Sequence, residues 1–360
     1  MEIILIGLPQ SGKTTIFNVL TDKENSKKHG GRIEYNISRV NVNDPRLDAI
    51  FEICPGKKKT PSHVDFIDMA GIAADEAQKG NRLPEGYIHA VRNADAFIMV
   101  ILSPLIGGVD NESEGCEILL KDLDFIESEL LLSDLDVIEK KLERLSKEIK
   151  LGKTEHKIEF EILNRCFDHL NNDLPLITLE MSQSEEKLIK SYAFLSRKPK
   201  LVLLNIDENE IGKDKYINFQ KKLEKNGLPL ESLCAKIEYE FLELPETDRA
   251  EFMQSMGIGV SGKDHLITSS YKLLELITFF TIGDDENKAW SIRKGSNALD
   301  AAGKIHSDIQ RGFIRAEVIK LNDLVELGSE VNVKKAGKLK SEGKNYIVED
   351  GDIIEFKFNV

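Results

Sequence analysis

The chain has 360 residues, of which 41% are apolar and 31% are charged, and its formal net charge is −13. This length suggests two or three domains, and the absence of any apolar run long enough to span a bilayer excludes a membrane protein. Because the acidic balance repels phosphate backbones, we expect no nonspecific DNA binding, and any nucleic-acid contact needs a local basic face.

The start of the chain and its cysteines favour a cytoplasmic protein. Residues 1–6 run directly into Gly7 and leave no room for the charged, apolar and cleavage regions of a signal peptide. The cysteines lie far apart with no C-x-x-C spacing, so we expect reduced thiols packed in the interior and no metal cluster. They are Cys54, Cys116, Cys166 and Cys234.

Alternating strand and helix patterns predict an open α/β sheet. Residues 2–6 form an apolar, β-branched run typical of a buried parallel strand, and a helix is expected over residues 13–20. Further buried strands are expected at residues 63–67, 96–101 and 200–204. The fold class that this indicates is α/β, with a mainly parallel, Rossmann-like sheet.

The middle and the end of the chain predict two further parts. Apolar residues recur at helical spacing over residues 121–170, and Leu151-Gly152-Lys153 can turn the chain, which indicates an inserted antiparallel α-helical hairpin. Ser182 followed by Glu185 matches a capping box that opens another helix. After residue 279 the pattern predicts a β-grasp-like module. Its expected elements are strands at residues 289–293, 313–319, 346–348 and 353–358 and a helix at residues 298–304.

A glycine-rich loop follows the first strand. Residues 7–14 match G-x-x-x-x-G-K-[ST] between a strand and a helix, the context that distinguishes a phosphate-binding loop from a plain glycine turn. Its backbone N–H groups can surround phosphates, Lys13 can reach the terminal phosphates, and the Thr14 hydroxyl can bind Mg²⁺.

Two later segments complete a nucleotide site. Residues 68–71 read D-x-x-G, so Asp68 can hold Mg²⁺ through water and the N–H of Gly71 can sense a terminal phosphate, although an Asp that closes a strand often only forms a turn. Residues 205–208 read N-x-x-E where guanine-specific proteins carry N-K-x-D. The longer Glu208, with Ile206 in place of Lys, loosens selection for guanine. Cys234 and Ala235 begin a second candidate base-contacting loop.

These motifs together resemble the YchF / Obg-like ATPase family, a branch of the Obg GTPases. The resemblance covers nearly the whole length, because residues 44–47, the helical hairpin and residues 289–295, 311–317 and 350–352 also look like family segments. The last three are similar to the family's TGS domain. The resemblance implies a P-loop nucleotide-binding domain at residues 1–118 and 198–278, a helical domain at residues 119–197 and a TGS domain at residues 279–360.

The same resemblance implies slow hydrolysis of ATP in preference to GTP and association with the ribosome. The partner expected is the 50S subunit or RNA, bound through the TGS and helical domains by a monomer. Carried over by position, Thr14 and Asp68 bind Mg²⁺, and Lys13 acts in catalysis. The nucleotide-binding set is Gly7, Gln10, Ser11, Gly12, Lys13, Thr14, Thr15, Gly71, Asn205, Ile206, Glu208, Cys234 and Ala235.

Three departures from the family pattern bear on activity. Arg32 stands where the family's first switch has a Thr, Glu112 falls near the position of its catalytic His, and residues 78–86 replace its glycine-rich stretch. Ile72, apolar as is usual in this family, cannot orient the attacking water. Loss of a hydroxyl and an imidazole would slow hydrolysis strongly, whereas Arg32 could act as an arginine finger on the phosphates.

Three functions therefore stay open. The first is a slow ATPase that works as a translation-associated switch. The second is a catalytically silent nucleotide-binding or RNA-binding module, and the third is a GTP-specific GTPase. Basic residues near Trp290 and Phe313 indicate either an RNA-binding face or a solvated sheet face over a core Trp. They are Arg293, Lys294, Lys304, Arg311 and Arg315.

Overall fold

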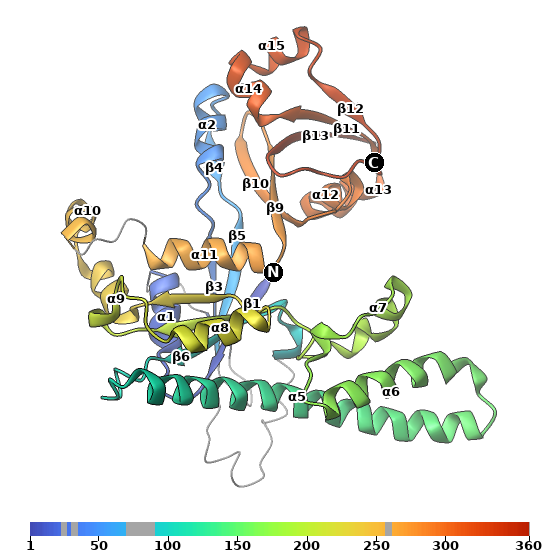
Figure 1. The fold of residues 1–360 in the computed structure, drawn as a ribbon. Coiled ribbons are helices and arrows are strands. Elements are labelled where there is room, and N and C mark those ends of the chain that lie inside the picture. The colour runs from blue at the N-terminus through green and yellow to red at the C-terminus, as the bar shows by residue number, and fades with distance from the viewer. Residues whose placement is uncertain (23–26, 30–34, 70–90, 256–260, 360) are drawn as a thin grey trace. The chain divides into compact units, whose positions relative to one another are not determined.

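The computed structural model describes residues 1–22, 27–29, 35–69, 91–255 and 261–359. These residues form two compact units, residues 1–38 with 65–266 and residues 39–64 with 267–360. Figure 1 shows their helices and strands along the chain. In the described part of the chain every helix is too short or too polar to span a bilayer.

A seven-stranded sheet organises the first unit, in the order β2-β3-β5-β1-β6-β7-β8. Strands β5, β1, β6, β7 and β8 are parallel, and β2 pairs antiparallel with β3. The expected α/β class with a mainly parallel sheet is therefore confirmed. The strands are β1 (Glu2–Gly7), β2 (Lys27–His29), β3 (Tyr35–Asn41), β5 (His63–Met69), β6 (Ala96–Leu102), β7 (Lys200–Asn205) and β8 (Leu230–Leu233).

Helices cover both faces of this sheet. Ile4 and Ile6 of β1 belong to a core shared with Phe219 of α8 and with the first half of α5, whereas α1 packs beside α9. Alternate residues of a strand point to opposite faces, so β1 is apolar throughout because both of its faces are buried. The helices are α1 (Lys13–Leu20), α5 (Glu112–Lys150), α6 (Lys157–Asn171), α7 (Gln183–Ile189), α8 (Ile217–Lys225), α9 (Ala235–Glu243), α10 (Glu246–Ser255) and α11 (Gly262–Leu273).

The predicted helical hairpin is present, and its first helix begins earlier than expected. Helix α5 starts at Glu112, capped by the side chain of Asn111, and runs for 39 residues before α6 returns beside it. Its first half packs on the sheet through residues such as Leu123 and Ile126, and its second half packs on α6 through Ile138 and Leu145. The capping box of Ser182 and Glu185 opens α7 as predicted.

A buried carboxylate fixes the hairpin to the segment that leads into β7. Asp134 of α5 is fully buried, and its two oxygens accept the N–H groups of Leu195 and Ser196 at 2.9 and 2.8 Å. The guanidinium of Arg92 lies 3.5 Å away. Burial raises the pKa of Asp134, opposed by these hydrogen bonds and by Arg92. The carboxylate thus satisfies two buried donors that irregular backbone would otherwise leave unpaired.

A six-stranded mixed sheet forms the second unit, in the order β12-β11-β13-β9-β10-β4. Alanines of α12 pack against one face, and α2, α14 and α15 pack against the other. The elements are α2 (Pro45–Ile53), β4 (Lys58–Thr60), β9 (Leu276–Thr281), β10 (Glu286–Arg293), α12 (Ala298–Ile305), α13 (Ser307–Arg311), β11 (Phe313–Lys320), α14 (Leu321–Leu327), α15 (Glu330–Lys335), β12 (Lys340–Glu342) and β13 (Asp352–Phe358).

Two details of this unit differ from the sequence analysis. The strand expected at residues 346–348 is wrong, because only a single bridge joins Ile347 to Asn297. Residues 39–64, which we assigned to the nucleotide-binding domain, pack instead with the C-terminal sheet, where Leu47 and Ile50 lie against Phe280. Division by compactness gives two units, and the three-part boundaries stay a prediction.

Two segments that suggested the family resemblance meet within the second unit. Asp44 caps α2, and Arg46 donates from Nη1 to Asp350 Oδ2 at 2.7 Å. Asp350 also accepts the N–H of Thr278 at 2.8 Å, and the Arg46 guanidinium lies over the Phe280 ring. Residues 44–47 and 350–352 are therefore connected by a polar contact that anchors α2 to the sheet.

Candidate functional site

The loop between β1 and α1 closes around its own lysine. Gly7 and Gly12 bound it, and Gly12 has φ 94°, a conformation that costs a residue with a Cβ about 1 kcal/mol. Gln10 also adopts a positive φ of 64°, which for a residue other than glycine marks strain of the kind found at binding sites. The first turn of α1 has no side-chain cap and no acidic residue, so it suits an anion.

Lys13 is buried inside this loop. Its Nζ donates to the carbonyl oxygens of Gly7 and Leu8 at 3.1 and 2.6 Å and to Ser11 Oγ at 3.4 Å. Burial lowers the pKa of Lys13 to about 8, and the nearby charge of Asp68 opposes this shift. The ammonium is therefore held by neutral carbonyls, and an anionic ligand would stabilise its charged form.

Thr14 and Asp68 form the oxygen pair expected for a metal site. Thr14 Oγ1 donates to Asp68 Oδ2 at 3.0 Å, although the two residues are 54 positions apart. Asp68 is 5% exposed, and its other oxygen, Oδ1, is buried without a hydrogen-bond partner in the described part of the chain. The side chain of Asn36 favours the charged form of Asp68, but it makes no hydrogen bond to Asp68 Oδ1.

The chemistry of this pair fits Mg²⁺. Burial raises the pKa of Asp68 against the opposing effects of Thr14, Asn36 and Lys13. Mg²⁺ prefers oxygen ligands and is usually bound through one or two carboxylates together with substrate phosphates. A cation beside the unpartnered Oδ1 would both satisfy that oxygen and favour the charged form of the carboxylate.

Asn205, at the end of β7, joins two loops. Its Nδ2 donates to the carbonyl of Ser11 at 3.1 Å, and its Oδ1 accepts the N–H of Ala235 at 3.1 Å. A Cβ on Gly12 would lie 2.3 Å from Asn205 Nδ2, so this bond requires glycine at residue 12. The structure thus brings Asn205 and Ala235 together with the loop at residues 7–14.

The remaining residues expected at the base lie beside Asn205. Ile206 is half-buried and donates its N–H to the carbonyl of Leu233 at 3.0 Å, and Cys234 is the buried residue that precedes α9. Burial raises the pKa of the Cys234 thiol. Glu208 has a side chain 42% exposed, and its Oε2 accepts from Lys236 Nζ at 2.9 Å.

The sequence analysis missed the pairing of Lys236 with Glu208. Lys236 follows Cys234 and Ala235 in the candidate base-contacting segment and lies in the first turn of α9. The signal that could have revealed it is topological, because β7 and β8 are parallel neighbours, so the loops that follow them meet at one edge of the sheet. An acid after one strand and a base after the next were therefore positioned to pair.

Other expected residues belong to the phosphate loop, where their exposure differs, or lie outside the described ranges. Gln10 and Thr14 are exposed, Thr15 is half-buried and Ser11 is buried. Arg32, Gly71, Ile72 and residues 78–86 fall in segments that the structure does not describe. The roles assigned to all these residues stay predictions.

The aromatic residues of the second unit pack inward. Trp290 donates from Nε1 to Thr281 Oγ1 at 3.0 Å, and both Trp290 and Phe313 contact the core of the C-terminal sheet. Arg311 pairs with Asp308, and Arg315 pairs with Glu317. These contacts favour the sheet-core interpretation of the two rings over a stacking platform for RNA.

Gly12→Ala tests the close approach of the loop to Asn205. We expect it to destabilise the protein by about 1–3 kcal/mol more than Gly152→Ala, because both residues have φ near 93° but only residue 12 lacks space for a Cβ. Urea denaturation of both variants measures the difference. Equal losses of stability would contradict a required glycine at residue 12.

Comparison with known proteins identifies the family. Residues 2–131 match a family model described as 50S ribosome-binding GTPase, and residues 276–359 match the model for the C-terminal part of YchF GTPases, described as a protein of unknown function. The "Ribosome-binding ATPase YchF" of Buchnera aphidicola subsp. Schizaphis graminum is 37% identical, over 99% of this chain and 98% of that protein. Its counterpart from Bacillus subtilis strain 168 is 36% identical with the same coverage.

A solved structure agrees with these sequence matches. The YchF GTPase of Schizosaccharomyces pombe superposes with a TM-score of 0.82 at 27% identity, covering 99% of this chain and 97% of that one. The matches extend over essentially the whole length of both the curated relatives and the solved structure. The chain belongs to the YchF family.

Proposed function

We propose that this protein binds ATP with Mg²⁺ at the loop of residues 7–14, hydrolyses it slowly, and acts as a nucleotide-controlled switch that associates with the ribosome. The observation that carries the proposal is the buried Asp68 oxygen without a partner, beside the Thr14 hydroxyl and the enclosed Lys13. The shared name of the relatives, ribosome-binding ATPase, supports both the nucleotide and the partner.

The residues of the loop have separable tasks in this proposal. The backbone N–H groups at the start of α1 would contact phosphate oxygens, and Lys13 would exchange its carbonyl acceptors for a terminal phosphate. Thr14 and Asp68 would hold Mg²⁺, which supplies positive charge next to the transferred phosphoryl group. Through its two hydrogen bonds, Asn205 would fix the position of the phosphate loop at Ser11 relative to the base-contacting segment at Ala235.

The contact of Glu208 with Lys236 supports a preference against guanine. A guanine-specific site uses a free carboxylate to accept hydrogens from the base, and its selectivity depends on that acceptor being available. Here the Lys236 ammonium occupies one Glu208 oxygen at 2.9 Å. This argues against the GTP-specific alternative.

One observation favours a catalytically silent variant of the same function. Glu112, which falls near the position of the family's catalytic His, starts α5 and accepts the N–H of Ile217 at 3.4 Å. That carboxylate has a structural contact and lies in place of a proton-transfer group. Nucleotide binding without hydrolysis is therefore the second candidate.

Binding and turnover measurements separate these candidates. We would titrate the full-length protein with ATP and GTP in the presence of Mg²⁺ and follow phosphate release with and without purified ribosomes. We expect ATP to bind more tightly than GTP and phosphate to be released slowly; in Lys13→Ala, ATP binding is expected to be much weaker and phosphate release to be lost. Binding without release under either condition would establish the silent candidate, and absence of binding to both nucleotides would reject the proposal.

The pH dependence of nucleotide affinity follows from Lys13. Because burial lowers its pKa to about 8 in the free protein, the ammonium that meets the phosphates is lost as the pH rises through that value. We expect ATP affinity to fall by up to about tenfold per pH unit above pH ~8. Calorimetric titrations from neutral to alkaline pH measure the ATP affinity, and Lys13→Ala serves as the control. A wild-type profile parallel to that of the variant would contradict the assignment.

Lys236→Ala tests the basis of nucleotide preference. Without the ammonium, Glu208 becomes a free acceptor, so the ratio of ATP to GTP affinity is expected to shift toward GTP by up to about fivefold, the size expected from an exposed ion pair. Competition binding measures the ratio. Lys221→Ala, which removes another exposed lysine of the same unit, is the matched control. An unchanged ratio in Lys236→Ala would exclude this contact from base selection.

A further inference from the structure

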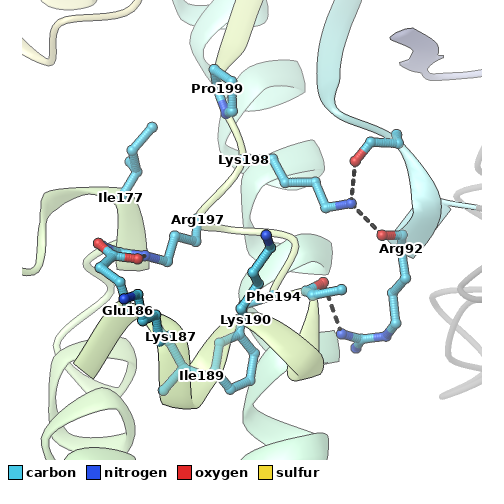
Figure 2. Close-up of a pocket in the computed structure, with 12 residues that line it drawn as sticks. Arg92, Ile177, Glu186, Lys187, Ile189, Lys190, Phe194, Arg197, Lys198 and Pro199 are labelled. Carbon is cyan, nitrogen blue, oxygen red and sulfur yellow. Dashed lines mark hydrogen bonds and ion pairs between the residues drawn. The ribbon is translucent and has the colours of Figure 1, made fainter. Parts of the chain in front are cut away.

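A second cavity lies in the first unit, away from the phosphate loop. Its volume is about 550 Å³, within the range of small-molecule pockets, and it lies next to α7 (Figure 2). Ala94 and Pro199 line it, and they lie just before the first residues of β6 and β7, Ala96 and Lys200. The phosphate loop follows the carboxyl end of β1, which is parallel to β6. The cavity is therefore at the opposite edge of the sheet, about 20 Å from that loop.

Basic side chains dominate the charged part of the lining. Five of them face a single carboxylate, that of Glu186, although the whole chain carries a net charge of −13. The buried Asp134 lies beneath and pairs with one of the five. Such a concentration of positive charge in an acidic protein raises the local concentration of anions. The basic residues are Arg92, Lys187, Lys190, Arg197 and Lys198.

Neutral groups hold two of these cations in place. Lys198 Nζ donates to the carbonyls of Val91, Arg92 and Ala94, and Arg92 donates to the carbonyls of Ser133 and Tyr192, both at 3.2 Å. Carbonyl oxygens satisfy N–H donors of both side chains without cancelling their charge, and of these two cations only Arg92 also has a carboxylate, that of Asp134, at 3.5 Å. Burial lowers the pKa of Lys198 to about 8, so a bound anion would relieve the cost of keeping this ammonium charged.

Arg197 occupies the opposite wall of the cavity. It donates to the carbonyl of Leu176 and forms an ion pair with both oxygens of Glu186. Figure 2 shows this pair on the other side of the cavity from Arg92. The single carboxylate of the lining is thus already engaged and does not neutralise the remaining lysines.

Lys187 and Lys190 are the cations available to a ligand. Both are exposed, and neither side-chain ammonium makes a hydrogen bond or an ion pair with any residue that the structure describes. Figure 2 shows the Lys190 side chain extending between Arg197 and Arg92. Two unpaired ammonium groups at the mouth of a cavity with fixed cations inside form a site for a multiply charged anion.

The rest of the lining is apolar. Ile189 and Phe194 are buried beneath the lysines, and the side chain of Ile177 is largely exposed at the rim. A ligand that fills this space would contact both the cations and these apolar groups. A simple inorganic anion would use only part of it.

We propose that this cavity is a second ligand site, which binds a small phosphate monoester with an aromatic or apolar body. The phosphate would lie between Lys187 and Lys190, and the body would lie in the cavity against its apolar lining, including the exposed side chain of Ile177. The site is separate from the nucleotide site proposed above and does not depend on it.

Phenyl phosphate is the simplest probe of this chemistry. We would titrate it calorimetrically into the full-length protein in the presence of ATP and Mg²⁺, and compare it with inorganic phosphate and with phenol. Phenyl phosphate is expected to bind more tightly than either compound, because only it meets both the cations and the apolar wall. Binding no tighter than that of inorganic phosphate would overturn the proposal.

Matched variants locate the binding site. Lys187→Gln with Lys190→Gln is expected to weaken phenyl phosphate binding about tenfold, the effect of losing charge-assisted hydrogen bonds. Lys221→Gln with Lys225→Gln removes the same charge from exposed positions of α8 and should leave the affinity unchanged. Equal affinity in the two double variants would overturn the proposal.

A variant that is expected to bind the probe more tightly distinguishes loss of the site from loss of folding, because misfolding would only weaken binding. Glu186→Gln removes the only carboxylate of the lining and frees Arg197, so it is expected to tighten binding about threefold or more. Weaker binding in this variant would contradict the proposed site. A single-stranded oligonucleotide that binds through Lys187 and Lys190 while phenyl phosphate does not would replace it with a nucleic-acid surface.

Discussion

The arrangement of the candidate site depends on one primary amide. Asn205 offers both a donor and an acceptor, and the structure uses each for a different loop, Ser11 on one side and Ala235 on the other. Because Asn205 is buried at the end of a central strand, both loops take their position from the sheet. A hydrogen bond lost here would leave a buried partner unsatisfied, which costs more than the bond itself contributes.

Local patterns were sufficient to predict β1, β5, β6 and β7 of the nucleotide-binding sheet, but not β2, β3 and β8. Its central strands are apolar because both faces are covered, and the loop of residues 7–14 follows the first of them in the expected way. The hairpin was also predictable, because two long amphipathic helices have few other ways to bury their apolar faces. The start of α5 was missed since residues 112–120 are acidic on one side and pack on the sheet with the other.

What the sequence did not reveal depends on contacts between distant residues. Strand β4 is short and polar, and it is ordered by pairing of Lys58 with Glu286 in β10. A local pattern carries no information about that partner. The same reason explains the pairing of Glu208 with Lys236 and the cavity beside α7, whose lining comes from three separate stretches of chain. The motifs predicted which residues surround the phosphate loop. The contacts that those residues make with distant parts of the chain became known only from the structure.

The length of α5 gives the hairpin a mechanical property. One uninterrupted helix packs on the sheet with its first half and on α6 with its second, so a tilt of the first half would carry the second half with it. About 20 residues project past the sheet, a reach of roughly 30 Å. A tilt of about 10° at the sheet would displace the hairpin tip by on the order of 5 Å. Any such tilt would therefore be amplified along the helix, and the displacement would be largest at its far end, beside Leu151.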